Sequence, residues 1–289
     1  MEYAILLAQA ALNGLVIGAM YVLMAVGFTL TFGIMRVVNF AHGEFYMLGA
    51  FTAFFTYVYW DIPFVLCLLI AAVTIGVLGA LVERALIQPF RGDETSAMIA
   101  TLAISVIIQN SAIVIWGPTP RQMPDIVQGT LLLGPFSFPW SRLLVIAAAA
   151  LIFAAFWLFM QATRIGRAMR AVAQDKEAAL IQGIRINTIY PLAFGLSVAL
   201  AALAGALMGP VFSVSPFVGL TPMLKAFVVV ILGGLGSIPG AVVGGLLLGL
   251  IESFTATMFG SLVADILQLL LVILILLVRP AGLLGQREV

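Results

Sequence analysis

The stretch NFAHGE, residues 39–44, places an amide, a histidine and a carboxylate within six positions of an otherwise apolar sequence. Imidazole and carboxylate groups can bind a metal ion, relay protons or line a polar path. Zinc sites in proteins use three or four protein ligands. His42 is the only histidine of the chain and Cys67 its only cysteine, so the ligand count disfavours a metal site.

Three interpretations of Asn39, His42 and Glu44 stay open. Ionisable residues inside membrane segments often mark ion pathways, which allows a proton relay. Alternatively, His42 and Glu44 pair with backbone at a helix break, where the positive end of a helix beginning near Gly43 favours the acid. The third interpretation is a direct role in lining or gating a path, with Asn39 supplying its amide.

The composition decides which kind of chain must position these residues. Hydrophobic residues make up 63% of the 289 residues and charged residues only 9%, which excludes an ordinary soluble domain. The uncharged windows are long enough for membrane helices, and they lack the polar–apolar alternation of outer-membrane barrel strands. The net charge of +1 gives no indication of nucleic-acid binding. We predict an all-α polytopic membrane protein, with one transmembrane domain over residues 1–289.

The apolar windows predict about eight to nine membrane helices, some of them discontinuous. The expected crossings are residues 5–31, 43–60, 63–82, 97–116, 143–161, 188–212, 241–259 and 262–278, with a short segment at 224–235. The short segment would be about 18 Å long at 1.5 Å per residue, too short to cross alone. We therefore expect it to be a discontinuous helix.

The basic residues predict the topology. Five of the 13 lysines and arginines lie in residues 164–185, so the loop at about 164–187 is expected to be cytoplasmic. Arg279 and Arg287 place the C-terminus on the same side, and Arg84 and Arg91 mark a second cytoplasmic loop. If every segment crosses, the N-terminus is extracytoplasmic. The proline-rich residues 117–141 are then an extracytoplasmic loop.

A second helix break is predicted in ILGGLGSIPGAVVGGLLLG, residues 231–249. Non-helical backbone at membrane depth must be surrounded by protein or line a watery cavity. Two Gly/Pro-interrupted segments, one in each half of a chain, indicate a translocation path and suggest an internal repeat, inverted or parallel. The alternative is that the glycines only allow close helix packing. The candidate path or gate residues of this segment are Gly233, Gly234, Gly236, Ser237, Pro239 and Gly240.

The basic loop contains a predicted short helix. In RAVAQDKEAALIQGI, Asp175 can cap its start with Glu177 in the first turn, and Gly183 suits the left-handed position past its end. Roughly seven residues do not form a stable helix alone in water. We expect the helix to dock on a cytoplasmic partner, or else to lie at the bilayer interface.

Three further charges lie in apolar surroundings. Asp265 is expected in the first turn of the last helix, where the dipole favours an acid. Lys225 is expected to snorkel from the end of the short segment. Glu252 has no evident partner in the sequence, and we expect it to contact a second membrane subunit.

Four long stretches give the sequence a family resemblance. They are NGLVIGAMYVLMAVGFTLTFGIMRVVNFAHGEFYMLGAF, GRAMRAVAQDKEAALIQGIRIN, KAFVVVILGGLGSIPGAVVGGLLLG and LVRPAGLLG, and they run from Asn13 to Gly285. In these stretches the chain resembles the LivH-type permease, the membrane subunit of bacterial ABC importers for branched-chain amino acids.

The resemblance implies a location, partners and a mechanism. Such permeases are multi-pass proteins of the bacterial inner membrane that work by alternating access. They pair with a second, related permease subunit, two cytoplasmic ATPase subunits and a periplasmic substrate-binding protein. The resemblance implies no cofactor in this chain, because the partner ATPases bind ATP and magnesium. The sequence agrees, since without a Gly-Lys dipeptide it cannot contain a P-loop.

By similarity, the basic loop contains the coupling helix that sits in a cleft of an ATPase subunit. The residues assigned to this loop are Arg170, Asp175, Lys176, Glu177, Ala178, Gly183 and Ile184. Two alternative functions stay open: a secondary transporter or channel for amino acids, and an ABC permease for urea or short amides. An enzyme is not expected, because the sequence shows no nucleophile–base or metal constellation.

Overall fold

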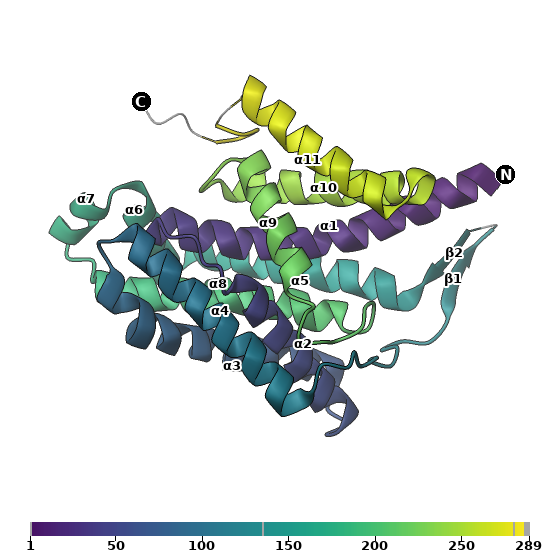
Figure 1. The fold of residues 1–289 in the computed structure, drawn as a ribbon, viewed down its shortest axis with the longest axis horizontal. Helices are drawn as coiled ribbons and strands as arrows, with labels where there is room; N and C mark the ends of the chain where they lie inside the picture. Colours follow the sequence, from purple (N-terminus) through teal and green to yellow (C-terminus); the bar gives the residue numbers. More distant parts are fainter. Residues whose placement is uncertain (1, 135, 280, 286–289) are drawn as a thin grey trace.

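The computed structural model describes residues 2–134, 136–279 and 281–285, and within them the chain is a bundle of helices with one small hairpin (Figure 1). The helices are α1 (Glu2–Met35), α2 (His42–Val58), α3 (Phe64–Val82), α4 (Glu94–Trp116), α5 (Trp140–Ala162), α6 (Arg164–Gln174), α7 (Lys176–Ile181), α8 (Ile186–Met208), α9 (Leu220–Gly233), α10 (Ile238–Phe259) and α11 (Ser261–Val278). A short π-helix, η1 (Glu83–Ile87), and a short 3-10 helix, η2 (Gln88–Phe90), extend α3. The strands are β1 (Thr130–Leu133) and β2 (Phe136–Pro139).

Seven helices of the described residues are long and apolar enough to cross a membrane: α1, α3 with its extension, α4, α5, α8, α10 and α11. The predicted all-α polytopic architecture is thus confirmed, and each predicted crossing lies on a helix. The segment predicted at residues 224–235 is α9, a helix of 14 residues. It is shorter than a crossing requires, as expected.

The predicted crossing at residues 43–60 is different, because α2 begins inside the bundle. Residues 36–41 run back from the end of α1, and His42 Nε2 lies 3.1 Å from the carbonyl oxygen of Met24. Met24 is eleven residues before the end of α1, so α2 begins about 16 Å from that end. A methyl group on Gly43 or on Gly219 would overlap the carbonyl of the other, so the starts of α2 and α9 touch. Both are half-helices that begin at the same depth.

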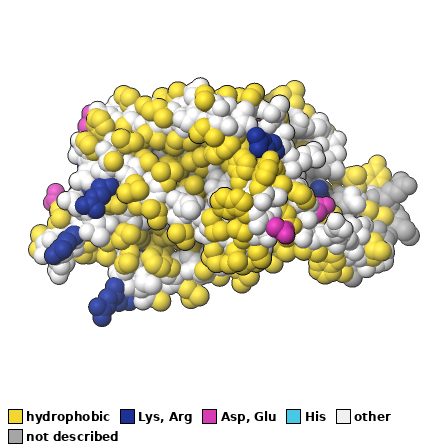
Figure 2. All heavy atoms as spheres, turned by 90° about the horizontal axis from the view of Figure 1, so that it is seen from below, with side chains coloured by type: hydrophobic (Ala, Val, Ile, Leu, Met, Phe, Trp, Pro, Cys, Tyr) yellow, Lys and Arg dark blue, Asp and Glu magenta, His cyan; other side chains and the backbone are white. Residues whose placement is uncertain are grey.

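The core of the bundle is built around α1 and α8. Both are buried along most of their length, whereas less than a third of α3, α4, α5, α10 and α11 is buried. α1 packs against α10, and α3 packs against α8. Figure 2 shows a largely hydrophobic face, with lysine and arginine gathered mostly toward one end. The exposed apolar sides of the outer helices match a lipid environment.

The two ends of the bundle carry different elements (Figure 1). The start of α1 lies at the end that carries the β1–β2 hairpin, and α6 and α7 lie at the other. The hairpin was not predicted within the loop 117–141. It pairs Thr130 with Pro139 and Leu133 with Phe136 in antiparallel register, and the turn residue Gly134 has φ +61°. The signal that the sequence carried for it is the glycine between a run of leucines and the alternating Phe136, Ser137 and Phe138.

Candidate functional site

The basic loop folds into two helices with well-defined caps. Thr163 Oγ1 accepts a hydrogen bond from the backbone N–H of Gly166 at 2.9 Å, which starts α6. Asp175 Oδ1 accepts from the N–H groups of Glu177 and Ala178 at 2.9 and 3.0 Å, which starts α7. The predicted cap is confirmed.

The end of α7 is also as predicted. Gly183 has φ +81°, its N–H donates to Leu180 O at 2.9 Å, and the N–H of Ile184 donates to Ala179 O at 3.0 Å. This is a Schellman motif, which the left-handed glycine permits. Ala179 is buried, whereas Ile181 is 84% exposed. The helix therefore presents an exposed apolar side chain at one end of the bundle, and the exposed Ala178, three residues earlier, lies on the same face.

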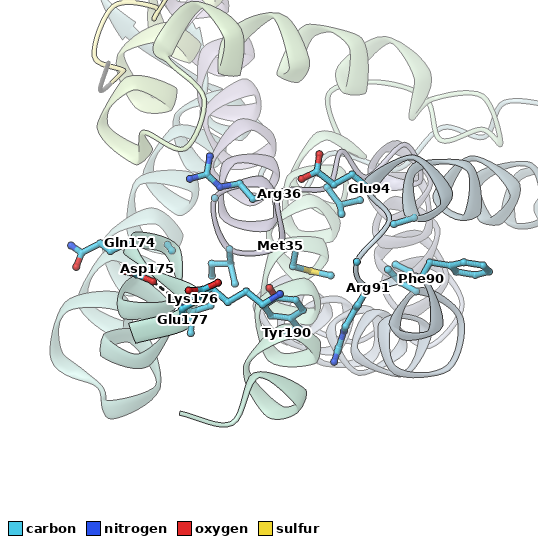
Figure 3. Close-up of a pocket in the computed structure, with 18 residues that line it drawn as sticks. Met35, Arg36, Phe90, Arg91, Glu94, Gln174, Asp175, Lys176, Glu177 and Tyr190 are labelled. Atoms are coloured by element: carbon cyan, nitrogen blue, oxygen red, sulfur yellow. Dashed lines mark hydrogen bonds between the residues drawn. The ribbon is translucent and has the colours of Figure 1, made fainter. Parts of the chain in front are cut away.

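Two cavities open beside this loop. The smaller, of about 440 Å³, is lined by Asp175, Lys176 and Glu177 on one side and by Phe90 and Arg91 on the other (Figure 3). The larger, of about 890 Å³, lies between α1, α5, α6 and the turn before α10. The smaller cavity thus adjoins α7, whereas the larger one adjoins α6 of the same basic loop.

Some of the residues predicted to form the path line the larger cavity. Gly236, Ser237 and Pro239 line it, as does Arg170 of the basic loop. Ser237 also caps α10, since its Oγ accepts from the N–H of Gly240 at 3.1 Å. The glycine-rich break therefore lies beside a cavity, as its composition suggested.

The other glycines of this segment serve close packing. A methyl group on Gly233 would overlap the backbone of Gly240, and one on Gly234 the backbone of Gly285. Gly234 has φ +103° and ends α9. Neither Gly233, Gly234 nor Gly240 lines either of the two cavities. The close backbone contacts of these three glycines support the packing interpretation.

Asn39, His42 and Glu44 lie apart from both cavities, inside the bundle. Asn39 Oδ1 accepts from the N–H of Ala41 at 3.0 Å, and Glu44 Oε1 accepts from Ser105 Oγ at 3.2 Å. With the contact between His42 and Met24, each residue fixes the chain around the start of α2. His42 does pair with backbone, as one interpretation expected, whereas Glu44 pairs with a side chain.

The three residues nevertheless keep unused polar atoms. Asn39 Nδ2, His42 Nδ1 and Glu44 Oε2 are buried without a hydrogen-bond partner among the described residues. No cluster of three histidine, cysteine, aspartate or glutamate residues that could hold a metal occurs in that part of the chain. A role of Asn39, His42 and Glu44 in the path or gate stays a prediction.

Comparison with known proteins assigns the family. The family model described as "Branched-chain amino acid transport system / permease component" matches residues 10–278. The high-affinity branched-chain amino acid transport system permease protein BraD of Pseudomonas aeruginosa is 35% identical, covering 97% of this chain and 96% of the relative. The corresponding LivH proteins of Salmonella typhimurium and Escherichia coli are each 33% identical over the same shares. No solved structure matches the chain.

The chain belongs to this family. It is a multi-pass membrane permease component of the branched-chain amino acid transport type, a transport subunit and not an enzyme. Membership agrees with the resemblance of the four sequence stretches, and the match extends over nearly the whole bundle.

The permease carries an ionic cluster inside the bundle that bears on three expectations, of which the contact of Glu252 with a second subunit stays a prediction. Glu252 has partners within its own chain: its Oε2 accepts from Tyr21 OH at 2.8 Å and from Gln268 Nε2 at 2.6 Å. Lys225 Nζ lies 3.5 Å from the same oxygen and 2.5 Å from Asp265 Oδ1, so it pairs internally and does not snorkel. Asp265 is the fifth residue of α11, beyond the first turn. Residues this far apart in sequence give no local signal of pairing.

A second polar cluster, at the corner between α3 and α4, was also missed. Glu83 is fully buried and forms an ion pair with Arg91, which also donates to Asn187 Oδ1 at 2.7 Å and lies 4.9 Å from the ring centroid of Tyr190. The sequence showed Arg91 only as part of a basic loop. Its partners on α8 lie almost one hundred residues further along the chain, so only the tertiary structure reveals them.

Proposed function

We propose that this chain is the membrane-spanning permease subunit of an ATP-driven importer that moves branched-chain amino acids by alternating access. Its family membership supports the transport class. The observation that supports the ATP-driven class is α7, a capped helix of six residues with an 84%-exposed Ile181 at its end. So short a helix is not stable alone, and its exposed apolar side chain suits a protein cleft.

The partners follow from this proposal. A cytoplasmic ATPase subunit takes up α7, and a second ATPase takes up the same helix of a related permease subunit. The ATPases bind the ATP and magnesium, and a periplasmic binding protein delivers the amino acid. The larger cavity beside Gly236, Ser237 and Pro239 is the inner part of the path, and Asn39, His42 and Glu44 set its gate at the start of α2.

The proposed orientation rests on the basic residues. Arg164, Arg167, Arg170 and Lys176 belong to α6 and α7, at the end opposite the N-terminus of α1 and the hairpin. Under the positive-inside rule, that end faces the cytoplasm. Cys67 is fully buried, so single cysteines can be introduced without replacing it. A cysteine at Lys176 should react with an impermeant maleimide only in inside-out vesicles.

The main test is co-purification from detergent-solubilised membranes with the permease tagged. The wild type should retain the ATPase subunit, and Ile181→Ser should lose it. The matched control is Leu132→Ser, which removes a similarly exposed side chain (69%) from the hairpin at the opposite end. Equal recovery of ATPase with both variants would refute docking through α7.

Transport by the purified components tests the energy source and the substrate class. In proteoliposomes, uptake of a labelled branched-chain amino acid should require the ATPases, the binding protein and ATP. Unlabelled leucine should compete with this uptake, whereas urea and short amides should not. Uptake by the permease alone, driven by a proton gradient, would refute the ATP-driven proposal.

A further inference from the structure

Arg91 connects the α3–α4 corner to the helix that follows the coupling loop. Its Nε and Nη2 donate to Glu83 Oε1, the former at 2.9 Å. Its Nη1 donates to Asn187 Oδ1, and the guanidinium lies over the ring of Tyr190. Asn187 is the second residue of α8, which begins at Ile186, five residues after the end of α7. The ion pair with Glu83 is enough to stabilise the corner. The contacts of Arg91 with Asn187 and Tyr190 on α8 therefore need another explanation.

Open space separates the corner from α7. The cavity of about 440 Å³ has Asp175 and Glu177 on one side and Phe90 and Arg91 on the other, with Tyr190 on its wall (Figure 3). A displacement of α7 can therefore reach the corner through the first turns of α8 and the Arg91 contacts. The π-helix η1, which begins with Glu83, replaces the regular α-helical hydrogen bonding directly after α3.

The helix that begins at the corner, α4, holds the start of α2. Thr101 Oγ1 accepts a hydrogen bond from the N–H of Phe40 at 3.1 Å. One turn further along α4, Ser105 Oγ donates to Glu44 Oε1 at 3.2 Å. Phe40 precedes α2 and Glu44 lies in its first turn. Both contacts therefore fix the break at which the half-helix α2 begins.

We propose that Arg91 and Thr101 are positioning residues that transmit movement of α7, through α8 and α4, to the start of α2. This inference rests on the proposed function, because it concerns how ATP binding in the partner reaches the transport path. Helix α4 begins at Glu94, three residues after Arg91, and is continuous through Thr101 and Ser105, so these two contacts move with its first turns. Arg91 suits this position because its planar guanidinium bonds Glu83 and Asn187 while it stacks on Tyr190, which a lysine cannot do.

The experiment uses the complete complex in proteoliposomes with the loaded binding protein. Two rates are measured on equal amounts of assembled complex: ATP hydrolysed and amino acid taken up. Arg91→Lys and Thr101→Val should raise the ATP hydrolysed per amino acid by roughly 2- to 30-fold, the range of coupling changes along such networks. The matched controls are Arg84→Lys, at an exposed arginine next to Glu83 in η1, and Thr101→Ser, which keeps the hydroxyl. Both should leave the ratio unchanged.

The double variant Arg91→Lys/Thr101→Val separates one shared route from two independent defects. If α4 carries the movement, the double variant should be no worse than the more severe single one. A wild-type ratio in both assembled single variants, or effects that multiply in the double variant, would overturn the proposal. If Arg91→Lys does not assemble, the proposal is decided by comparing the ATP hydrolysed per amino acid in Thr101→Val and Thr101→Ser. Failure of the wild type to retain an ATPase would instead refute the proposed function, and this inference with it.

Discussion

Lys225 is predicted to stabilise the bundle, because among the described residues it supplies the positive charge of the cluster that joins α1, α9, α10 and α11. Its Nζ lies 2.5 Å from Asp265 Oδ1 and 3.5 Å from Glu252 Oε2, and it also donates to Gln268 Oε1. Glu252 Oε2 accepts from Tyr21 OH and Gln268 Nε2. Replacing Lys225 with methionine keeps the length of the side chain but leaves two carboxylates without a counter-charge.

The exposure of each partner determines how much stability Lys225→Met should lose. The side chains of Lys225 and Glu252 are 12% and 20% exposed, whereas that of Asp265 is 58% exposed. Removing one partner of a buried pair costs about 3–5 kcal/mol, and an exposed pair contributes only about 0–1 kcal/mol. Water therefore solvates Asp265, and most of the cost falls on Glu252. We expect Lys225→Met to lower the free energy of unfolding by about 2–3 kcal/mol, below the fully buried range.

A double variant tests the cause. Glu252→Gln removes the charge and keeps an oxygen that can accept from Tyr21 and Gln268. Since an unpaired buried charge costs more than a missing pair, Lys225→Met/Glu252→Gln should recover more than half of the loss.

The assay is thermal unfolding of the purified permease in detergent, followed by tryptophan fluorescence, for the wild type, both single variants and the double variant. Lys176→Met, on the exposed face of α7, is the control for loss of a lysine. An unchanged midpoint for Lys225→Met, or strictly additive losses in the double variant, would refute the reasoning.

Other predictions follow from single contacts. Gly49→Ala should destabilise the bundle by about 1–3 kcal/mol, because the new methyl would overlap the carbonyl of Ala202; Gly33→Ala, whose methyl would have its nearest neighbour at 3.7 Å, should not lower the thermal midpoint. Asp175→Ala should cost α7 about 1 kcal/mol and speed its amide hydrogen exchange, whereas Asp175→Asn keeps the cap and the wild-type exchange. Cys67, which is fully buried, should react with a maleimide only after denaturation; labelling of the native protein would contradict its placement.

The features that could be predicted from the sequence are those with local causes. The apolar windows gave the helices, since length and composition alone determine which segments can cross lipid. The cap at Asp175 and the left-handed Gly183 were predicted because capping depends on residues within one or two turns. The short length of α9 also followed from counting residues.

The features that were missed depend on contacts between distant segments. Nothing near Arg91 in the sequence indicates Asn187, and nothing near Lys225 indicates Glu252. The predicted crossing at residues 43–60 is the helix α2, but its starting depth inside the bundle could not be predicted for a related reason. Arg36 adopts φ +57°, uncommon for a residue other than glycine, and the chain then returns into the bundle before α2 begins. Hydropathy does not distinguish such a return from a simple loop.

The internal repeat, which the sequence only suggested, is another feature that depends on contacts between distant segments. α1 and α8 run in opposite directions, the half-helices α2 and α9 start from one contact and run to opposite ends, and α3 and α10 follow each in turn. The packing of α1 on α10 has its counterpart in the packing of α8 on α3. In this arrangement the counterpart of residues 36–41 is residues 209–219, and not the glycine-rich segment that the sequence suggested. The polar residues of NFAHGE have no ionisable equivalent in residues 209–219. The two halves therefore share helix directions and contacts but not side-chain chemistry, so residue similarity could not reveal the repeat, and any role of His42 and Glu44 belongs to the first half alone.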